Sequence, residues 1–172
     1  MAGLSRPLVT KILSCDGAHK SDFGGVRLNL DTAADIRAAL EEIGDAAAHA
    51  GIATNGFLVE EQSSPGVEMV LGGLWDPRFG PCVMVGLGGV FVEVFEDVAF
   101  RTCPISTDDA RDMIRSLRAA PLLRGARGAP PCDEEAVIAA LVALGGTGGL
   151  MEALDGQATE IDINPLIVRP EG

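Results

Sequence analysis

The chain has 172 residues, which is enough for one domain with a substantial core or for two small lobes. Hydrophobic residues make up 47% of it and aromatic residues only 4%, so the chain is not expected to be disordered, and its core must be built mainly from Val, Leu, Ile and Ala. A formal net charge of -12 argues against a nucleic-acid-binding protein, because neutralising phosphates requires clustered Lys and Arg.

Two strands, a long polar loop and a helix are predicted in the first fifty residues. The apolar runs alternate with period two, the loop closes on Gly24-Gly25, and Asp31 to Asp35 carry helix N-cap signals. The expected bounds are Leu8–Ser14 and Val26–Leu30 for the strands, Cys15–Gly25 for the loop and Asp31 to about Ala50 for the helix.

Strands outnumber helices in the rest of the chain. N-cap signals predict helices from Ser106 to Arg118 and from Asp133 to about Leu144. Strands are predicted at Phe57–Glu61, Val67–Leu74, Pro81–Gly86, Val90–Val94, Val98–Thr102 and Ile161–Val168. Because hairpins dominate this part, the expected fold class is α+β, or an α/β sandwich, with a mainly antiparallel sheet and flanking helices.

The cellular setting is predicted from the termini and the cysteines. The N-terminus lacks the apolar stretch of a signal peptide, and no apolar run is expected to approach the length of a membrane span. The runs 8–13 and 67–74, for example, are too short and too interrupted. Four cysteines without a CxxC pair are expected to be reduced and inert in a cytoplasmic protein. They are Cys15, Cys82, Cys103 and Cys132.

The run Glu160–Leu166 is the strongest candidate for a metal site. Side chains at i and i+2 share one face of a strand, so the carboxylate of Asp162 and the amide oxygen of Asn164 are expected to project together. Both are hard oxygen donors of the kind that Mg²⁺ takes alongside water and phosphate. Pro165 is expected to end the ladder and so place the pair near a strand end. An ordinary surface strand explains the pattern equally well.

Two features are candidates for phosphate contact. Glycines let backbone N–H groups turn toward an anion, which makes Gly86, Gly88 and Gly89 candidates between two apolar strands. A tight glycine hairpin is the alternative, and the pattern alone favours it. Lys11, inside the first strand, either reaches phosphates as a point charge or simply extends into solvent.

The remaining candidates are histidines and glutamates. His19 lies in a polar loop, a setting suited to a neutral nucleophile or proton carrier, whereas His49 at the end of a helix is better explained by a favourable contact with the helix dipole or by simple exposure. Glu61 and Glu68 close one strand and enter the next, so both carboxylates could face one pocket and accept hydrogen bonds from hydroxyls or an exocyclic amine. Solvated surface glutamates are the alternative.

Taken together and in this order, the segments resemble the ATP-grasp domain of the NDP-forming acyl-CoA synthetases. That group includes the ADP-forming acetyl-CoA synthetase beta subunits and is similar to the succinyl-CoA synthetase beta chain. The resemblance covers nearly the whole chain. It rests on Val9–Ile12, His19–Val26, Phe57–Glu61, Gly66–Met69, Asp76–Pro81, Gly86–Glu93, Pro121–Gly125 and Ile161–Val168.

The resemblance implies a set of ligands and roles. The cofactors would be ATP or ADP and Mg²⁺, and a histidine in the loop would carry phosphate between the acyl-phosphate site and the nucleotide site. The implied roles are phosphate contact for Lys11 and for Gly86 to Gly89, the adenine-side hinge for Glu61, ribose hydroxyls for Glu68, Mg²⁺ for Asp162 and Asn164, and phosphate transfer for His19.

The resemblance also implies a domain organisation and partners. Residues 1–56 would form a partial first ATP-grasp subdomain and residues 57–172 the second. Because Lys11 follows only ten residues, the N-terminal part of the first subdomain is expected to be absent, as is the CoA-binding part. The implied activity is that of a subunit or fragment of an acid–thiol ligase. The implied partner is a CoA-binding chain or domain, and a homo-oligomer is a further possibility. The alternative is a catalytically inactive ATP-grasp remnant that acts as a nucleotide-binding or protein-interaction module.

Overall fold

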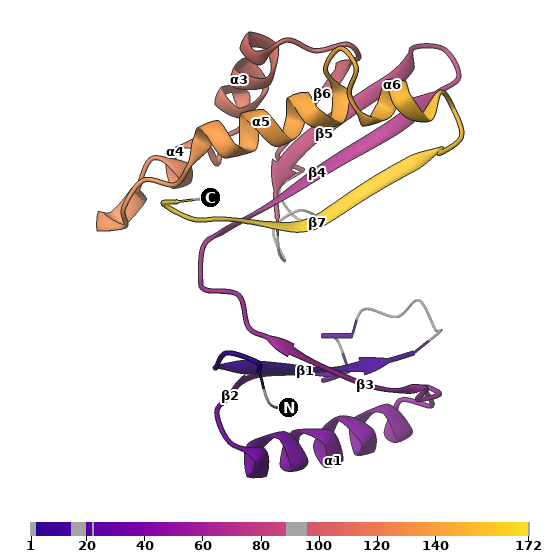
Figure 1. Cartoon of the computed structure of the whole chain (residues 1–172), viewed down its shortest axis with the longest axis vertical. Helices are drawn as coiled ribbons and strands as arrows, with labels where there is room; N and C mark the ends of the chain where they lie inside the picture. The colour runs from indigo at the N-terminus through magenta and orange to yellow at the C-terminus, as the bar shows by residue number, and fades with distance from the viewer. Residues whose placement is uncertain (1–2, 15–19, 22, 89–95, 172) are drawn as a thin grey trace. The chain divides into compact units, whose positions relative to one another are not determined.

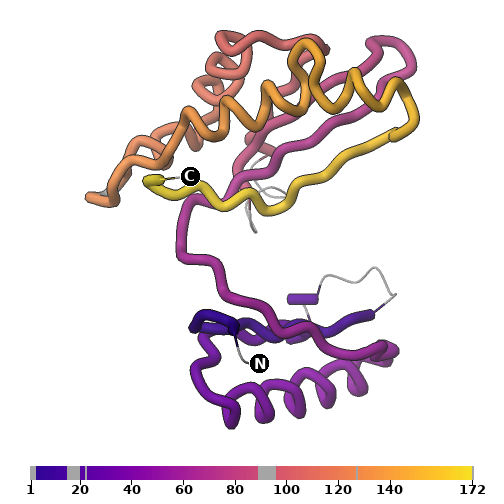
Figure 2. Tube along the Cα trace, in the orientation of Figure 1, coloured from indigo at the N-terminus to yellow at the C-terminus, as the bar shows by residue number. Residues whose placement is uncertain are grey.

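The chain divides into two compact units, Met1–Ser64 and Pro65–Gly172. The computed structural model describes residues 3–14, 20–21, 23–88 and 96–171. Each unit is a sheet with one or more helices packed on it (Figures 1 and 2). The sequence analysis put the boundary between residues 56 and 57, whereas in the structure it follows the strand Gly56–Glu61. That strand pairs with Leu8–Leu13, so its hydrogen bonds belong to the first unit.

The first unit is a three-stranded antiparallel sheet with one helix on one face (Figure 1). Its elements are β1 (Leu8–Leu13), β2 (Val26–Leu30), α1 (Ala33–His49) and β3 (Gly56–Glu61), with the strand order β2-β1-β3. The central strand β1 therefore pairs on both sides, and its regular register with β3 decides to which face each of its side chains points.

Helix α1 begins and packs as its sequence predicts. The hydroxyl of Thr32 accepts a hydrogen bond from the backbone N–H of Asp35, and the Asp35 carboxylate accepts one from the N–H of Thr32, so a capping box closes the first turn. The buried residues of α1 recur at helical spacing: Ile36, Ala39, Ile43 and Ala47. They pack against Leu8 and Ile12 of β1, which therefore face the helix.

The second unit is a four-stranded antiparallel sheet. Its strands are β4 (Val67–Asp76), β5 (Gly80–Leu87), β6 (Val98–Thr102) and β7 (Glu160–Val168), in the order β6-β5-β4-β7. The last strand of the chain thus pairs with the first strand of the unit, and β4 and β5 form the centre. The predicted strand Val90–Val94 lies outside the residues that the structure describes.

Helices cover one face of this sheet, as Figure 1 shows. They are α3 (Thr107–Ser116), α4 (Ala120–Leu123), the 3₁₀ helix η2 (Ala126–Gly128), α5 (Glu134–Gly145) and α6 (Leu150–Leu154). The core between helices and sheet includes Leu71, Val83, Ile114 and Leu141, each without solvent exposure. The buried clusters of the described residues each belong to a single unit, so each unit has its own core.

The sequence prediction missed two short α-helices and one 3₁₀ helix. Pro121 lies in the first turn of α4. Backbone N–H groups in the first turn of a helix have no acceptor within the helix, so the missing N–H of proline costs no helical hydrogen bond there. The 3₁₀ helix η2 lies in the glycine- and proline-rich segment Arg124–Pro131, for which the sequence analysis predicted no helix. Helix α6 follows a glycine turn, Gly146–Gly149, and has only five residues, too few for periodicity to reveal.

One stretch of the described residues, Glu134–Leu154, is long and apolar enough to cross a membrane by length and composition alone. The sequence analysis expected no such stretch. Its mean hydropathy is 1.7, and 44% of it is buried inside the protein. In the structure the glycine turn breaks it into α5 and α6, and Val137, Ile138 and Leu141 pack in the core of the second unit. Because a buried core helix passes the same test, the stretch is weak evidence for a membrane span.

Candidate functional site

In the first unit, Lys11 lies on the face of the sheet that α1 leaves uncovered. Successive side chains of a strand point to opposite faces, and Leu8 and Ile12 point toward α1, so Val9 and Lys11 point away from it. Val9 pairs with Glu60 and Lys11 pairs with Leu58, which places all four side chains on this uncovered face. A half-buried lysine therefore stands in a partly apolar surface.

The ammonium of Lys11 forms an ion pair with Glu60. Its Nζ lies 2.8 Å from Oε2 of Glu60, and each side chain is 40% exposed. The sequence analysis did not single out Glu60. The antiparallel register that brings it beside Lys11 joins residues about fifty positions apart, and strand periodicity alone does not reveal such pairing.

Glu61, the neighbouring candidate, points the other way. It pairs directly with Leu8, so its side chain lies on the α1 side of the sheet. There its Oε1 accepts a hydrogen bond of 2.7 Å from the backbone N–H of Ser5. The structure therefore does not bring the carboxylate of Glu61 together with Lys11, and of the two glutamates it is Glu60 that accompanies the lysine.

In the second unit, Glu68 lies beside Gly88 at one end of the central strands β4 and β5. Met69 and Leu71 face the helices, so Glu68 points to the uncovered face of the sheet, where its side chain is exposed. The backbone N–H of Gly88 donates a 2.7 Å hydrogen bond to the carbonyl oxygen of Glu68. That N–H is thus already engaged within the unit.

Close packing explains why Gly86 and Gly88 are glycines. A Cβ on Gly88 would lie 2.8 Å from the carbonyl carbon of Glu68, and one on Gly86 would lie 2.7 Å from Cγ1 of Val98. Neither residue adopts the positive φ that the hairpin alternative requires. Gly89 lies outside the described part of the chain, so the turn itself is not described.

Asp97 anchors the other side of this strand end. Its two carboxylate oxygens accept hydrogen bonds from the backbone N–H groups of Arg118 (2.8 Å) and Ala119 (2.7 Å), just before α4. Its own carbonyl oxygen accepts from Leu87 at 3.3 Å. Asp97 therefore connects the end of β5 to the α3–α4 junction, a role that no local sequence pattern indicates.

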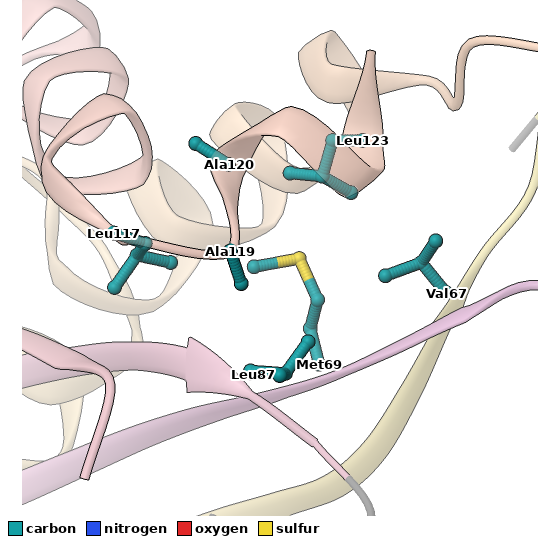
Figure 3. Close-up of a pocket in the computed structure, with 7 residues that line it drawn as sticks. All are labelled: Val67, Met69, Leu87, Leu117, Ala119, Ala120 and Leu123. Atoms are coloured by element: carbon teal, nitrogen blue, oxygen red, sulfur yellow. The ribbon is translucent and has the colours of Figure 1, made fainter. Parts of the chain in front are cut away.

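A small apolar pocket lies beside this junction, on the helix side of the sheet (Figure 3). The Met69 thioether lies near its centre. Its lining is Val67, Met69, Leu87, Leu117, Ala119, Ala120 and Leu123. Because no side chain of this lining is polar, the pocket offers nothing to a phosphate or a cation.

The predicted metal ligands lie on β7 with both side chains exposed. Asp162 pairs with Gly72, a residue of the uncovered face, so its carboxylate lies on the same face as Glu68. The two are about 13 Å apart along the strand direction, since Glu68 and Gly72 are four positions apart on β4. The pairing of β4 with β7 shifts register between Ile163 and Leu166, around Asn164.

The prediction that this pair lies near a strand end was wrong. Strand β7 continues past Pro165 to Val168, so Asp162 and Asn164 lie in its middle. The pairing resumes beyond the register shift because Leu166 and Val168 have partners on β4 and pack in or against the core.

The donor set suits a magnesium ion that is shared with a phosphate. Among the residues that the structure describes, no group of three or more His, Cys, Asp or Glu side chains could hold a metal ion by itself. Mg²⁺ usually takes only one or two protein carboxylates and completes its octahedron with water and phosphate oxygens. An exposed carboxylate and a nearby amide on an uncovered sheet face meet that requirement.

The described candidates thus form two groups, one on each unit. Lys11 and Glu61 belong to the first unit. The second unit carries Glu68, Gly86, Gly88, Asp162 and Asn164. The candidate phosphate carrier His19 lies outside the described residues, as Gly89 does. The other histidine, His49, is exposed at the end of α1, where its Nδ1 lies 2.7 Å from the carbonyl oxygen of Asp45.

Two of the cysteines fit the inert role that their sequence predicts. Burial raises the pKa of the Cys82 thiol, and the neighbouring carboxylate of Asp76 adds to the effect. Burial also raises the pKa of Cys103. Both thiols therefore stay protonated at neutral pH, which makes them weak nucleophiles.

Comparisons with known proteins agree on one family. The model of a family described as an ATP-grasp domain matches residues 1–172. The chain is 40% identical over 163 residues to the beta subunit of acetate–CoA ligase (ADP-forming) I from Pyrococcus furiosus, and the match covers 93% of this chain and 68% of that subunit.

Solved structures give the same result. Acetyl-coenzyme A synthetase 1 of Ca. Korarchaeum cryptofilum, in complex with coenzyme A, Ca-AMPCP and HgCl+, matches with a TM-score of 0.84 and 42% identity, over 98% of this chain and 73% of that one. A second structure of that enzyme contains coenzyme A and Mg-AMPPCP, with its phosphohistidine segment pointing towards the nucleotide binding site. It matches with a TM-score of 0.78 and 43% identity, over 97% of this chain and 72% of that one.

Proposed function

We propose that this chain, which belongs to the ATP-grasp family of the ADP-forming acyl-CoA synthetases, moves a phosphoryl group between a nucleotide and a histidine. The nucleotide is ATP or ADP with Mg²⁺. Together with a CoA-binding partner, this transfer couples cleavage of an acyl-CoA thioester to phosphorylation of ADP. In the reverse direction, ATP drives formation of the thioester.

One observation carries the proposal. A structural neighbour that matches 98% of this chain at a TM-score of 0.84 was solved with coenzyme A and Ca-AMPCP, and a second was solved with Mg-AMPPCP. The described residues of this chain supply the corresponding chemistry: a lysine on one uncovered sheet face, and a carboxylate with a nearby amide on another.

Lys11 supplies positive charge to the nucleotide phosphates. Phosphoryl transfer needs neutralisation of the charge on the β- and γ-oxygens more than it needs covalent help from the protein. Asp162 and Asn164 would hold Mg²⁺, which would supply further neutralisation of phosphate charge when bound. Glu68, exposed on the same face as Asp162, is the candidate for the ribose hydroxyls.

His19 is the proposed phosphate carrier. The unprotonated ring nitrogen attacks the γ-phosphorus of ATP, a nitrogen–phosphorus bond forms, and ADP leaves with the electron pair of the broken phosphorus–oxygen bond. Of the two histidines of the chain, His49 has one ring nitrogen beside the Asp45 carbonyl at the end of α1, on the helix side of the first sheet. The polar loop that holds His19 is the better setting for transfer.

The partner is proposed to be a CoA-binding chain or domain. The structural neighbours bind coenzyme A, and the Pyrococcus furiosus relative is a beta subunit. We also propose a cytoplasmic location, where nucleotide and acyl-CoA pools are available. Selectivity for the acyl group is assigned to the partner, because the partner would bind the acyl-CoA.

Labelling from ATP tests the transfer. The chain is incubated with Mg²⁺ and ATP labelled on the γ-phosphate, and acid-labile label on protein is followed in the unsubstituted chain, in His19→Ala and in His49→Ala. Label that disappears only in His19→Ala supports the proposal. Label in all three, or in none, contradicts it.

Ligand stabilisation separates an active subunit from an inert module. A ligand at 100 times its Kd raises the free energy of unfolding by about 2.7 kcal/mol if it binds only the folded state. Stabilisation by Mg-ATP without labelling of His19 would favour the second candidate, a nucleotide-binding module. No stabilisation at all would exclude both.

A further inference from the structure

We propose that Glu60 is a positioning residue that holds the Lys11 ammonium in place for a nucleotide phosphate. The inference rests on the proposed function, because it concerns the lysine that contacts the phosphates. In this proposal Glu60, and not Glu61, is the carboxylate of the first unit that acts together with Lys11.

The register of the sheet makes the pair possible. Glu60 lies opposite Val9, and Lys11 lies opposite Leu58, so Lys11 and Glu60 are diagonal neighbours on one face of two paired strands. Diagonal neighbours in an antiparallel sheet are within reach of long side chains. The observed separation of 2.8 Å between Nζ and Oε2 is that of a close ion pair. Oε2 accepts no hydrogen bond with good geometry from the described residues, so the attraction within the pair is between the two charges.

The surroundings of the pair favour a fixed geometry. Although the Glu60 side chain is 40% exposed, its Oε2 atom, the one that faces Lys11, is shielded from solvent. Val9 on the same face is only 5% exposed. A lysine stem that lies along such a surface and ends in an ion pair has fewer rotamers available than a free lysine.

The pair leaves the lysine able to bind phosphate. An ammonium has three N–H donors, and because the ion pair with Glu60 is not an aligned hydrogen bond, donors remain for phosphate oxygens. A ligand that meets a pre-positioned donor loses less conformational freedom on binding, which raises affinity. Glu60 would therefore act on the nucleotide only through Lys11, and this indirect action can be measured.

A double-mutant cycle tests the inference. The Kd of Mg-ATP is measured by calorimetry for the unsubstituted chain, Glu60→Ala, Lys11→Met and the double variant. Glu60→Ala is expected to weaken binding about three- to fivefold in the presence of Lys11, the range of a partly exposed ion pair. In the Lys11→Met background the same substitution is expected to leave Kd unchanged, because the group through which it acts is gone.

The first unit offers a matched control. Arg27 and Glu42 form an ion pair of the same 2.8 Å length across the sheet and α1. Glu42→Ala removes a pair of equal length from the helix side and is expected to leave the Kd of Mg-ATP unchanged. Adenosine, which has no phosphate, serves as the ligand control, and its binding is expected to be equal in Glu60→Ala and the unsubstituted chain.

The outcomes distinguish the inference from the function on which it rests. Absence of Mg-ATP binding by the unsubstituted chain would overturn the proposed function and this inference with it. Mg-ATP binding that Glu60→Ala leaves unchanged, or weakens equally with and without Lys11, would overturn the inference alone. Equal loss of affinity for Mg-ATP in Glu42→Ala would also overturn it, because a general loss of sheet order would then explain the effect.

Discussion

The carboxylate of Asp97 accepts a hydrogen bond from the backbone N–H of Ala119 at 2.7 Å, across 22 residues of sequence. The same carboxylate accepts the N–H of Arg118, so one side chain satisfies two donors just before α4. Two charge-assisted hydrogen bonds in a partly buried setting make Asp97 a structural anchor of the second unit.

Replacement of that anchor should destabilise the protein. Asp97→Asn removes the charge and one of the two acceptor oxygens, and we expect a loss of about 1–2 kcal/mol in the free energy of unfolding, measured by urea denaturation. The control is Asp108→Asn, which removes an exposed ion pair with Arg111 and should change stability by less than about 0.5 kcal/mol. Equal losses in the two variants would refute the anchor role.

Two glycines should respond to alanine in opposite directions. A Cβ on Gly88 would lie within 3.0 Å of three backbone atoms of Glu68 and Met69, so Gly88→Ala should cost about 1–3 kcal/mol. Gly44 lies inside α1, where a Cβ would have an ordinary contact of 3.8 Å with Phe57. Gly44→Ala should stabilise by about 0.5–1 kcal/mol, because alanine is the better helix former. Thermal and urea unfolding of both variants measure whether Gly88→Ala lowers the free energy of unfolding and Gly44→Ala raises it.

Asp162 should matter for nucleotide binding only when magnesium is present. We expect Asp162→Ala to weaken binding of Mg-ATP about tenfold or more and to leave binding of ATP in EDTA unchanged, as loss of a metal ligand requires. The matched control is Glu160→Ala, since Glu160 lies on the same strand, pairs with Leu74 and is also exposed. An equal effect with and without magnesium would show that Asp162 acts as a general charge and not as a metal ligand.

The α3 cap should make stability depend on pH. Hydrogen bonds from the backbone and side chain of Ser106 hold the pKa of Asp109 below its ordinary value of 3.8, and Arg101 adds a smaller effect. A lowered pKa in the folded state means that the stabilisation is complete above the ordinary value and is lost as the pH falls through the lowered one.

The difference in stability between the unsubstituted chain and Asp109→Asn should therefore be constant from pH 7 to pH 5 and shrink below about pH 4. Urea midpoints at several pH values measure it. A difference that grows on acidification would contradict the assigned direction of the pKa shift.

The helices show how far local sequence signals reach. Thr32 with Asp35 and Ser106 with Asp109 predict two helix starts, and both form capping boxes. Asp133 likewise caps α5 through the N–H of Ala136. These signals are local, because each cap depends on residues three positions apart.

The features that the sequence did not predict depend on register and distant contacts. Strand periodicity indicates that Glu60 and Glu61 point to opposite faces, but only the pairing of β3 with β1 decides which of them lies beside Lys11. Likewise the alternation around Asp162 predicts a strand, whereas the continuation of β7 past Pro165 follows from its pairing with β4. Asp97 escaped notice because its partners lie 21 and 22 residues away.

The separate cores of the two units have a consequence for tolerance to mutation. Buried residues of α1, such as Ile43, contact others of the N-terminal half, whereas Leu141 and its neighbours form a cluster confined to the C-terminal half. A cavity-forming change in one half should therefore remove packing contacts from the core of that half alone. Over evolutionary time, such independence allows each half to accumulate substitutions, or to be exchanged by recombination, without requiring compensating changes in its neighbour's interior.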